Sequence, residues 1–371
     1  MRIKSRKYKD IARIIRLCCI TGAMFAYSST AYATIAVSHH SLPTGGEFLH
    51  DVTGTIESNG SIMDITQNAA NAVIEWQDFS IGTNATVNFQ SSVFSKTDNE
   101  KNTAEFNVLN YVDSGAVSQI YGNLNAVYKD KTTGFNVSGN VYLVNTAGAL
   151  ISKSAEINVG SLYVSNRSMT PEQLSTFQTG GENPVINGTL TSAELMNLGH
   201  VKADKVTFDG QRVILDLDYL KGHDNKQLAA NEIIVKTNNK KNKDDNKYYV
   251  NDVVIGYTAY KNNTYENQNS GTGNIATVYV NDSAEASKYT KQEGYMWVKD
   301  VNQLQAMNTN LSGNYALKNS IDAIATKDWK NNFIAIGSGN GSEEQKSQAF
   351  TGKFDGLDNN IFGLTVTENS D

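Results

Sequence analysis

From residue 34 onward, the chain consists of short runs of alternating apolar and polar residues separated by clusters of Gly, Asn, Ser and Asp. Examples are GTIESNGSIMDIT, GNVYLVNTAG and KVTFDGQRVILDLD. Each run has about four to seven residues and the turn residues recur about every ten residues, which is the usual spacing of strands and turns in all-β proteins. Two all-β architectures, a sandwich and a β-solenoid, fit this spacing.

Several details favour the solenoid. Stretches such as AEINVGSLYVSN place two short strands around a bend of one or two residues, and the strands do not clearly pair up as hairpins. Asn and Gly are frequent in the turns, and both tolerate the left-handed backbone that corners require. We therefore predict a right-handed parallel β-helix, in which each turn of the chain buries its apolar face only by stacking on its neighbours. Hairpins outside the helix and a short helix on a loop complete this prediction. The segment TPEQLSTF, residues 170–177, has the Thr-Pro start of such a helix.

One stretch changes its alternation in mid-course. In NAVIEWQDFSIG, residues 71–82, Ile74 and Trp76 share one parity, whereas Phe79 and Ile81 have the opposite parity. In a flat strand, a shift of one residue would turn one of these pairs towards water. A corner or bulge between the pairs would direct both into one core. We therefore predict a corner here, with Trp76 and Phe79 as large core residues near the start of the stack.

The first 33 residues differ from the remainder. A basic segment, MRIKSRKYKDIARIIR, is followed by a short apolar run and by AYA, which ends at Ala33. This is the layout of a secretory signal peptide, with cleavage between Ala33 and Thr34. A membrane anchor is the alternative, but the apolar run is shorter than the roughly 20 residues that span a bilayer.

Cleavage would change both the charge and the cysteine content. Residues 1–33 hold seven basic residues and one acid, so 25 basic and 37 acidic residues would remain, a net charge of −12. No basic face is then expected for nucleic acid. Cys18 and Cys19 would also be lost. Two explanations for the absence of cysteine from the cleaved chain stay open. A chain without disulfides can pass through a narrow pore, and a large core is stable without disulfides.

Several carboxylates of the sequence are candidates for catalytic groups. Retaining glycoside hydrolysis needs two carboxyl groups about 5 Å apart in a cleft. Three carboxylate pairs are candidates: Asp216 and Asp218, Asp244 and Asp245, and Asp355 and Asp358. Acids in such turn-rich contexts are mostly exposed, and none of the histidines has a zinc-ligand spacing. The expectation is therefore a protein that is not an enzyme, with no metal and no cofactor. The alternative is a β-helical lyase or hydrolase acting on extracellular polysaccharide.

Three blocks in order resemble the secretion domain of the filamentous haemagglutinin family, the exoproteins of two-partner secretion. Residues 71–90 are similar to the Asn-Trp-x-x-Phe-x-Ile-Gly block of that family, with Glu75 where Asn is usual. Residues 118–126, SQIYGNLNA, resemble its Ser-x-Ile-x-Gly block, and residues 139–166 resemble the block built around Asn-Pro-Asn-Gly. In that third block Thr146 and Ala147 replace Pro and Asn. Residues 127–138 look like an insertion between the second and third blocks.

The resemblance implies a secreted, adhesin-like exoprotein of a Gram-negative-type bacterium. Its N-terminal domain would direct export from the periplasm through an outer-membrane β-barrel transporter with periplasmic recognition modules, and would nucleate β-helix folding at the cell surface. The receptor on a host or neighbouring cell is not defined by the sequence. The resemblance and the turn chemistry assign recognition or nucleation to seven residues: Trp76, Phe79, Gly82, Gly122, Asn123, Asn145 and Gly148.

The distal part shows a second resemblance. Residues 295–323 and 350–366 look like the Gly-Leu-rich repeat unit, of GLUG-like type, of large bacterial surface proteins, and VNQLQAMNTN within them predicts a short helix. Residues 237–249 and 260–274 are polar and predict exposed loops. The expected organisation is a signal peptide at 1–33, a two-partner-secretion domain at 34–190, a β-helix continuation at 191–294 and a repeat region at 295–371. A single repeat unit is unusual, so we expect a truncated region or a fragment of a longer gene product.

Overall fold

The computed structural model describes residues 37–182, 184–229, 231–237, 253–265, 276–280, 294–329, 333–337 and 349–366. The expected signal peptide, with its cleavage site at Ala33 and Thr34, lies outside these residues. The chain forms two compact units. The larger comprises Thr34–Tyr257 and Gly271–Gly294, and the smaller includes Thr258–Ser270 and Tyr295–Asp371. Within the described residues, none of the helices combines the length and the apolar character of a transmembrane span.

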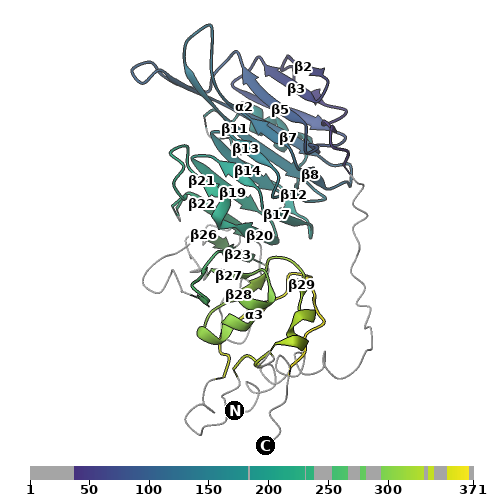
Figure 1. Cartoon of the computed structure of the whole chain (residues 1–371). Coiled ribbons are helices and arrows are strands. Elements are labelled where there is room, and N and C mark those ends of the chain that lie inside the picture. The colour runs from purple at the N-terminus through teal and green to yellow at the C-terminus, as the bar shows by residue number, and fades with distance from the viewer. Residues whose placement is uncertain are drawn as a thin grey trace, which may run out of the picture. The chain divides into compact units, whose positions relative to one another are not determined.

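The larger unit is a coil of parallel strands with three faces (Figure 1). Sheet 1 contains β4 (Asn71–Trp76), β7 (Thr103–Val112), β11 (Asn136–Asn145), β14 (Ser161–Ser165), β19 (Lys205–Asp209), β22 (Ile233–Thr237) and β26 (Thr277–Val280). Sheet 2 contains β8 (Ser118–Ile120), β12 (Ala149–Ile151), β17 (Glu194–Asn197), β20 (Arg212–Asp216) and β23 (Val253–Tyr257). Sheet 3 contains β3 (Ile62–Gln67), β5 (Thr86–Ser91), β9 (Asn123–Asn125), β13 (Glu156–Asn158), β18 (His200–Lys202) and β21 (Leu220–Lys221). A short helical turn, η1 (Leu217–Tyr219), precedes β21.

The chain visits these sheets in a constant order. It runs from β7 to β8 to β9, then from β11 to β12 to β13, and so on, and each passage through the three sheets is one rung. Successive rungs pair in parallel; β7 and β11, for example, are in register from Thr103–Asn136 to Val112–Asn145. A sandwich of antiparallel sheets is excluded by this pairing, and the predicted parallel solenoid is confirmed.

Apolar side chains from all three sheets fill the interior of the coil. Phe106 and Phe208 come from sheet 1, Leu195 from sheet 2 and Phe89 from sheet 3, and each is at most 1% exposed. Burying one such side chain contributes roughly 1.5–3 kcal/mol. No rung can gain this alone, because its interior face is covered only when neighbouring rungs are present.

The first rung is closed by antiparallel strands. In sheet 1, β1 (Glu47–Phe48) pairs with β4, and in sheet 3, β2 (Gly54–Asn59) pairs with β3 along its whole length. These strands cover the edge that a parallel stack would otherwise leave open for pairing with another chain. They lie at the purple end of the ribbon in Figure 1.

Two hairpins extend sheet 1. Strand β6 (Lys96–Asp98) pairs antiparallel with the start of β7, and β10 (Val127–Lys129) pairs antiparallel with the start of β11. The Phe94 and Phe135 rings pack edge to face with centroids 6.2 Å apart. Residues 127–138, which the sequence marks as an insertion, thus form a hairpin of β10 with the start of β11.

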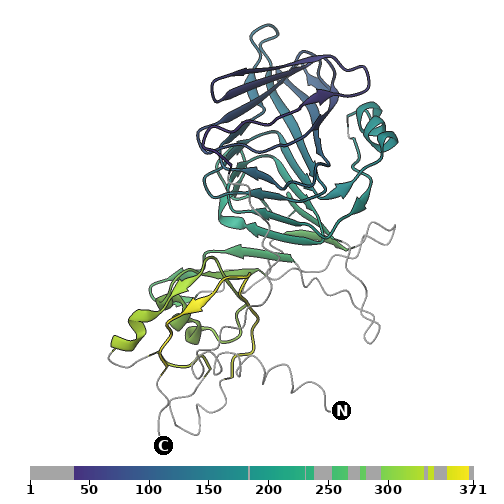
Figure 2. The ribbon, with the colours of Figure 1, turned by 90° about the vertical axis from the view of Figure 1, so that its right-hand side faces the viewer.

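A longer excursion leaves the fourth rung between β14 and β17. Its neck is a two-stranded ribbon of β15 (Arg167–Ser168) and β16 (Thr189–Leu190), and its tip carries helix α2 (Pro171–Thr179). The Thr170 side chain and Gln173 form a reciprocal capping box at the helix start. The predicted helix over 170–177 is confirmed, and Figure 2 shows it beside the stack.

The smaller unit contains short strands and helical turns. A parallel sheet joins β27 (Tyr295–Val298), β28 (Tyr315–Leu317) and β30 (Phe354–Asp355), and β29 (Ile321–Asp322) pairs in parallel with β31 (Ile361–Phe362). Helix α3 (Val301–Ala306) continues into η2 (Met307–Thr309), which confirms the short helix expected in VNQLQAMNTN, and η3 (Ile324–Asp328) follows.

Two expected polar loops have different outcomes. Within 260–274, strands β24 (Tyr260–Lys261) and β25 (Thr264–Tyr265) form a hairpin, so the prediction of a loop there is wrong at its start. Tyr265 is buried and its hydroxyl donates to the Trp297 carbonyl, 2.9 Å away, which fixes the hairpin. The other expected loop, 237–249, begins with the last residue of β22, and 238–249 lie outside the described residues.

Candidate functional site

The change of parity at residues 71–82 is a corner between two sheets. Strand β4 of sheet 1 ends at Trp76, Asp78 then bridges antiparallel to Thr44, and Ile81 already pairs in parallel with Ile120 of sheet 2. Trp76, on one side of the bend, is 3% exposed, and Ile81, on the other, is fully buried. The bend directs both apolar pairs into the same core, as the alternation of the sequence predicts.

The aromatic residues of this corner pack together inside the first rungs. The rings of Trp76 and Phe79 meet edge to face at 5.4 Å, and Phe79 stacks on Phe89 of β5 at 6.4 Å. The Trp76 indole N–H donates to Asn110 Oδ1 of β7 at 3.0 Å. Trp76 thus fills core volume while its only polar atom is satisfied by the next rung.

Gly82 and Gly122 occupy the corner between sheets 2 and 3 in successive rungs. A Cβ atom on Gly82 would lie 2.1 Å from the carbonyl oxygen of Ser38, and one on Gly122 would lie 2.2 Å from the carbonyl oxygen of Gly82. The Ser38 segment is held there by backbone hydrogen bonds, among them Asn84 N–H to the His39 carbonyl at 2.7 Å. These glycines are required by close backbone approach, because a Cβ at either position would collide with a neighbouring chain segment.

Asn145 and Gly148 form the corner between β11 and β12. The Asn145 amide group donates to the Ala116 carbonyl at 2.9 Å and to Ser118 Oγ at 2.8 Å, which ties the third rung to the second. Its Oδ1 accepts the Ala147 N–H at 2.8 Å, and its carbonyl accepts the Gly148 N–H at 2.9 Å. Gly148 has φ +94°, and a Cβ there would lie 2.3 Å from a backbone oxygen of the fourth rung. Thr146 and Ala147 complete this turn without the proline of the related pattern.

Asn123 has a different setting, on the outward face of sheet 3. Its side-chain amide donates to Thr86 Oγ1 of the preceding rung at 3.2 Å. Two residues further along β9, the side-chain amide of Asn125 donates to Asn88 Oδ1 of the preceding rung at 3.0 Å. These bonds link successive rungs on the solvent side of the sheet.

The seven predicted residues lie at corners and on one outer face. Trp76, Phe79 and Gly82 belong to the first rung, Gly122 and Asn123 to the second, and Asn145 and Gly148 to the turn within the third. The ring contacts of Phe79 with Trp76 and Phe89 lie within the first rung, whereas the other six residues contact a neighbouring rung or chain segment, so the arrangement can order the stacking of rungs.

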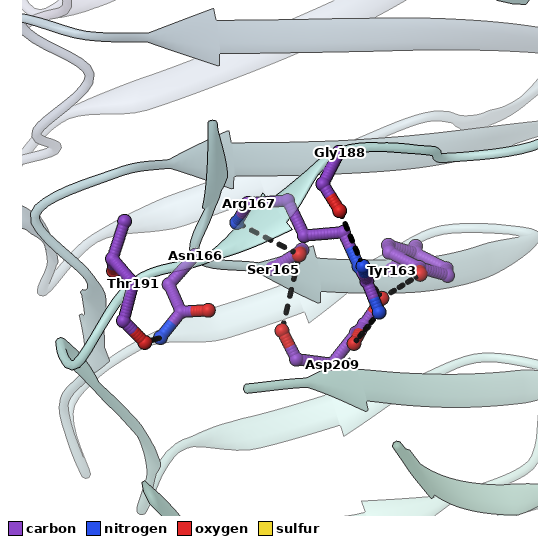
Figure 3. A network of polar contacts seen from close by, with 7 residues as sticks. All are labelled: Tyr163, Ser165, Asn166, Arg167, Gly188, Thr191 and Asp209. Atoms are coloured by element: carbon purple, nitrogen blue, oxygen red, sulfur yellow. Dashed lines mark hydrogen bonds and ion pairs between the residues drawn. The ribbon is translucent and has the colours of Figure 1, made fainter. Parts of the chain in front are cut away.

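The structure contains a buried ion pair that the sequence did not predict (Figure 3). Arg167 in the neck of the excursion meets Asp209 at the end of β19 with Nε to Oδ2 at 2.7 Å and Nη2 to Oδ1 at 3.1 Å. The two side chains are 7% and 1% exposed. The Tyr163 hydroxyl donates to the same carboxylate at 2.5 Å, and the third guanidinium nitrogen donates to the Gly188 carbonyl at 2.6 Å. The signal in the sequence was a single Arg directly after a strand, but nothing in the sequence named its partner.

Asp216 also differs from its expected environment. We expected it in a solvated turn, but it is fully buried at the end of β20, where it caps η1 by accepting the Asp218 N–H at 3.3 Å. Asp218, the other member of this candidate pair, lies in η1. Asp244 and Asp245 lie outside the described residues, and among the residues that the structure describes no group of three His, Cys, Asp or Glu could hold a metal ion.

Comparison with known proteins identifies the family. The family model described as the TPS secretion domain matches residues 36–326, more than half of the chain. The chain belongs to the TPS secretion domain family. Such domains serve two-partner secretion, so this one is part of a secreted protein exported by a two-partner system. Its family is one of secretion domains rather than of enzymes.

Its relatives include two proteins of Haemophilus influenzae, each named heme/hemopexin-binding protein. One is 27% identical over 211 residues, 55% of this chain and 19% of the relative, and the other is 32% identical over 161 residues, 43% and 14%. The part of this chain that matches thus spans less than a fifth of the length of these relatives. A solved structure, the HMW1 secretion domain from Haemophilus influenzae, is similar at 16% identity with a TM-score of 0.36, covering 88% of this chain and 85% of that one.

Proposed function

We propose that this domain directs export through a partner outer-membrane β-barrel transporter and nucleates β-helix folding at the cell surface. The observation that carries the nucleation role is the set of contacts between consecutive rungs at the first three corners. The first rung is capped by antiparallel strands, Gly122 lets the second rung approach the first closely at Gly82, and the Asn145 amide ties the third rung to the second. A stack that starts from a closed end can grow in one direction as further rungs appear.

This growth would supply a driving force without nucleotide hydrolysis. Each emerging rung buries its apolar face on the rung before it, and that burial opposes return of the chain through the transporter. In the periplasm the unfolded strands would be recognised by modules of the transporter, and addition of a strand to a sheet edge is a suitable mode for an extended chain. Residues Trp76, Phe79 and Asn123 would act after export, through folding.

The remaining assignments follow from the two resemblances. We propose an adhesin-like exoprotein at the surface of a diderm bacterium, with the secretion domain at 34–190, a β-helix continuation at 191–294 and a Gly-Leu-rich repeat region at 295–371. We also propose that the coil is right-handed, because crossover connections between parallel strands are right-handed in nearly all known sheets.

The experiment measures the secreted fraction in a bacterium that expresses the chain with its partner transporter. Asn145→Asp replaces the amide donor by a carboxylate that faces the Ala116 carbonyl, and Gly148→Val brings a branched side chain to φ +94° against the fourth rung. Both variants should be synthesised normally but exported less.

The matched control is Gly134→Val at the tip of the β10–β11 hairpin. Gly134 also has a positive φ, +75°, but a Cβ there meets no atom within 4 Å. Export of this control should stay close to that of the natural sequence. Equal export of the natural chain, Asn145→Asp and Gly148→Val would refute the proposed function.

A further inference from the structure

The outer face of sheet 1 carries an apolar stripe over the first three rungs. Val73 of β4, Leu109 of β7 and Val144 of β11 point away from the core of the coil, yet all three are fully buried. The excursion covers them, and its Leu174 and Phe177 on α2 belong to the same apolar cluster. The docking of α2 therefore decides whether this stripe faces water.

A column of three asparagines runs beside this stripe. Asn71 of β4 pairs with Asn107 of β7, and Asn107 pairs with Asn140 of β11, so the three lie in direct register. The Asn140 side-chain amide donates to Asn107 Oδ1 at 3.1 Å, and that of Asn107 donates to Asn71 Oδ1 at 2.7 Å. Asn71 and Asn107 are 5% and 1% exposed. Each amide thus finds a hydrogen-bond partner on the neighbouring rung, as buried polar groups require.

The column ends on α2. The Asn71 amide donates to the Gly181 carbonyl at 2.7 Å and to the Gln178 carbonyl at 3.4 Å. These carbonyls lie in the last turn of α2 and directly after it, where a helix leaves carbonyl groups without partners of its own. The Gln178 side chain donates in turn to the His50 carbonyl at 2.8 Å. Asn71 and Gln178 therefore attach the end of the helix to the first rung and to the segment that follows β1.

The direction of every bond in this column is set at its contact with α2. A backbone carbonyl can only accept, so the amino group of Asn71 must face α2 and its Oδ1 must face Asn107. Asn107 must then donate to Asn71 and accept from Asn140. If one amide turned over, two acceptors or two donors would meet, which is costly for buried groups. A slip of one residue in any of the three strands would remove an asparagine from the column.

We propose that Asn140, Asn107 and Asn71 form a hydrogen-bond relay that lets α2 dock only on three rungs stacked in register. Asn71 holds the helix end directly, whereas Asn107 and Asn140 act through it as positioning residues. The excursion emerges later in the chain than the strands beneath it, so it covers them only after their stacking is correct. This proposal concerns the folded chain itself and does not rest on the export function.

The test is hydrogen–deuterium exchange of the purified full chain. Asn107→Asp keeps the shape of the side chain but replaces its donor by an acceptor. The Asn71 amide must then turn to donate to the new carboxylate, and it presents its oxygen to the carbonyls of α2. We expect amide exchange in α2 to rise about tenfold, because buried acceptors lose their donor. Exchange in β17 and β18 of the fourth rung should change much less.

The matched control is Asn88→Asp. Asn88 is also the middle member of a column, since it accepts from Asn125 at 3.0 Å and donates to Asp64 Oδ1 at 2.8 Å, but that column lies on the outer face of sheet 3. Exchange in α2 should stay at the natural rate in this control. A double variant adds a second comparison. Because Asn107 acts through Asn71, α2 should exchange no faster in Asn71→Ala with Asn107→Asp than in Asn71→Ala alone.

Three outcomes would overturn the relay. One is natural exchange of α2 in Asn107→Asp, which would mean that the apolar contacts alone hold the helix. Another is an equal rise in α2 and in β17 and β18, which would make the column a contributor to global stability only. The third is a double variant in which the two effects add. If Asn107→Asp does not fold, Asn140→Asp at the partly buried end of the column decides. A rise confined to α2 then supports the relay, and an unchanged α2 refutes it.

Discussion

The first-rung corner should be a main determinant of the stability of the coil, and replacing Phe79 tests this. Phe79 is fully buried between Trp76 and Phe89, so Phe79→Ala removes both ring contacts and leaves a cavity at the closed end of the stack. Truncation of a buried Phe to Ala costs about 3–5 kcal/mol. Because domains are stable by about 5–15 kcal/mol, this one change would remove a large part of the free energy of unfolding.

The assay is urea unfolding of the purified chain, followed by far-ultraviolet circular dichroism. The control is Phe94→Ala, because Phe94 is only partly buried and packs on Phe135 beside the hairpins, away from the corner. We expect the urea concentration at the midpoint of unfolding to fall much further for Phe79→Ala than for Phe94→Ala. A loss below about 1 kcal/mol at Phe79, or equal losses in the two variants, would refute the reasoning, because a well-packed core position cannot be emptied at so small a cost.

Three further predictions concern other parts of the coil. Gly122→Ala places a methyl group against the Gly82 carbonyl and should cost about 1–3 kcal/mol in urea unfolding. Gly222→Ala should cost less, because the atom nearest to its methyl group would be a side-chain oxygen of Asp224 at 3.2 Å. Burial raises the pKa of Tyr142 to about 12, above the value near 10 of an unfolded chain. The contribution of neutral Tyr142 to the free energy of unfolding is therefore complete below about pH 10 and is lost as pH rises to about 12, by up to roughly 3 kcal/mol. The free energy of unfolding measured against pH should decline less steeply in Tyr142→Phe, and an identical decline would contradict this. Thr170→Ala removes the cap of α2 and should cost about 1 kcal/mol; exchange of the α2 amides checks it, and protection equal to that of the natural chain would show that the cap is dispensable.

The sequence was sufficient to predict features that depend on interactions between residues close together in the chain. The corner after Trp76 could be predicted because the apolar alternation shifts by one residue there. Only a bend at that point lets the apolar pairs on both sides face the same core. The turn from Asn145 to Gly148 follows from a side chain that bonds its own backbone and from a residue that accepts a positive φ. Helix α2 begins where Thr170 and Pro171 allow it to begin.

Other features were decided only by the way that distant segments meet. Alternation assigns Val73 to the outer face of β4, and only the excursion, about a hundred residues later in the chain, makes that face buried. The sequence predicts Asp216 as an exposed acidic residue of a turn, whereas the stacking of the rungs buries it.

The sequence by itself determined a coil of short strands, the places where it bends and the glycines that let its corners touch, because strand alternation and turn chemistry act over a few residues. The tertiary structure alone decided that Arg167 pairs with Asp209 and that an outer face becomes a second core. Burial and charge pairing depend on which rung lies next to which, and no local pattern encodes a neighbour 42 residues away.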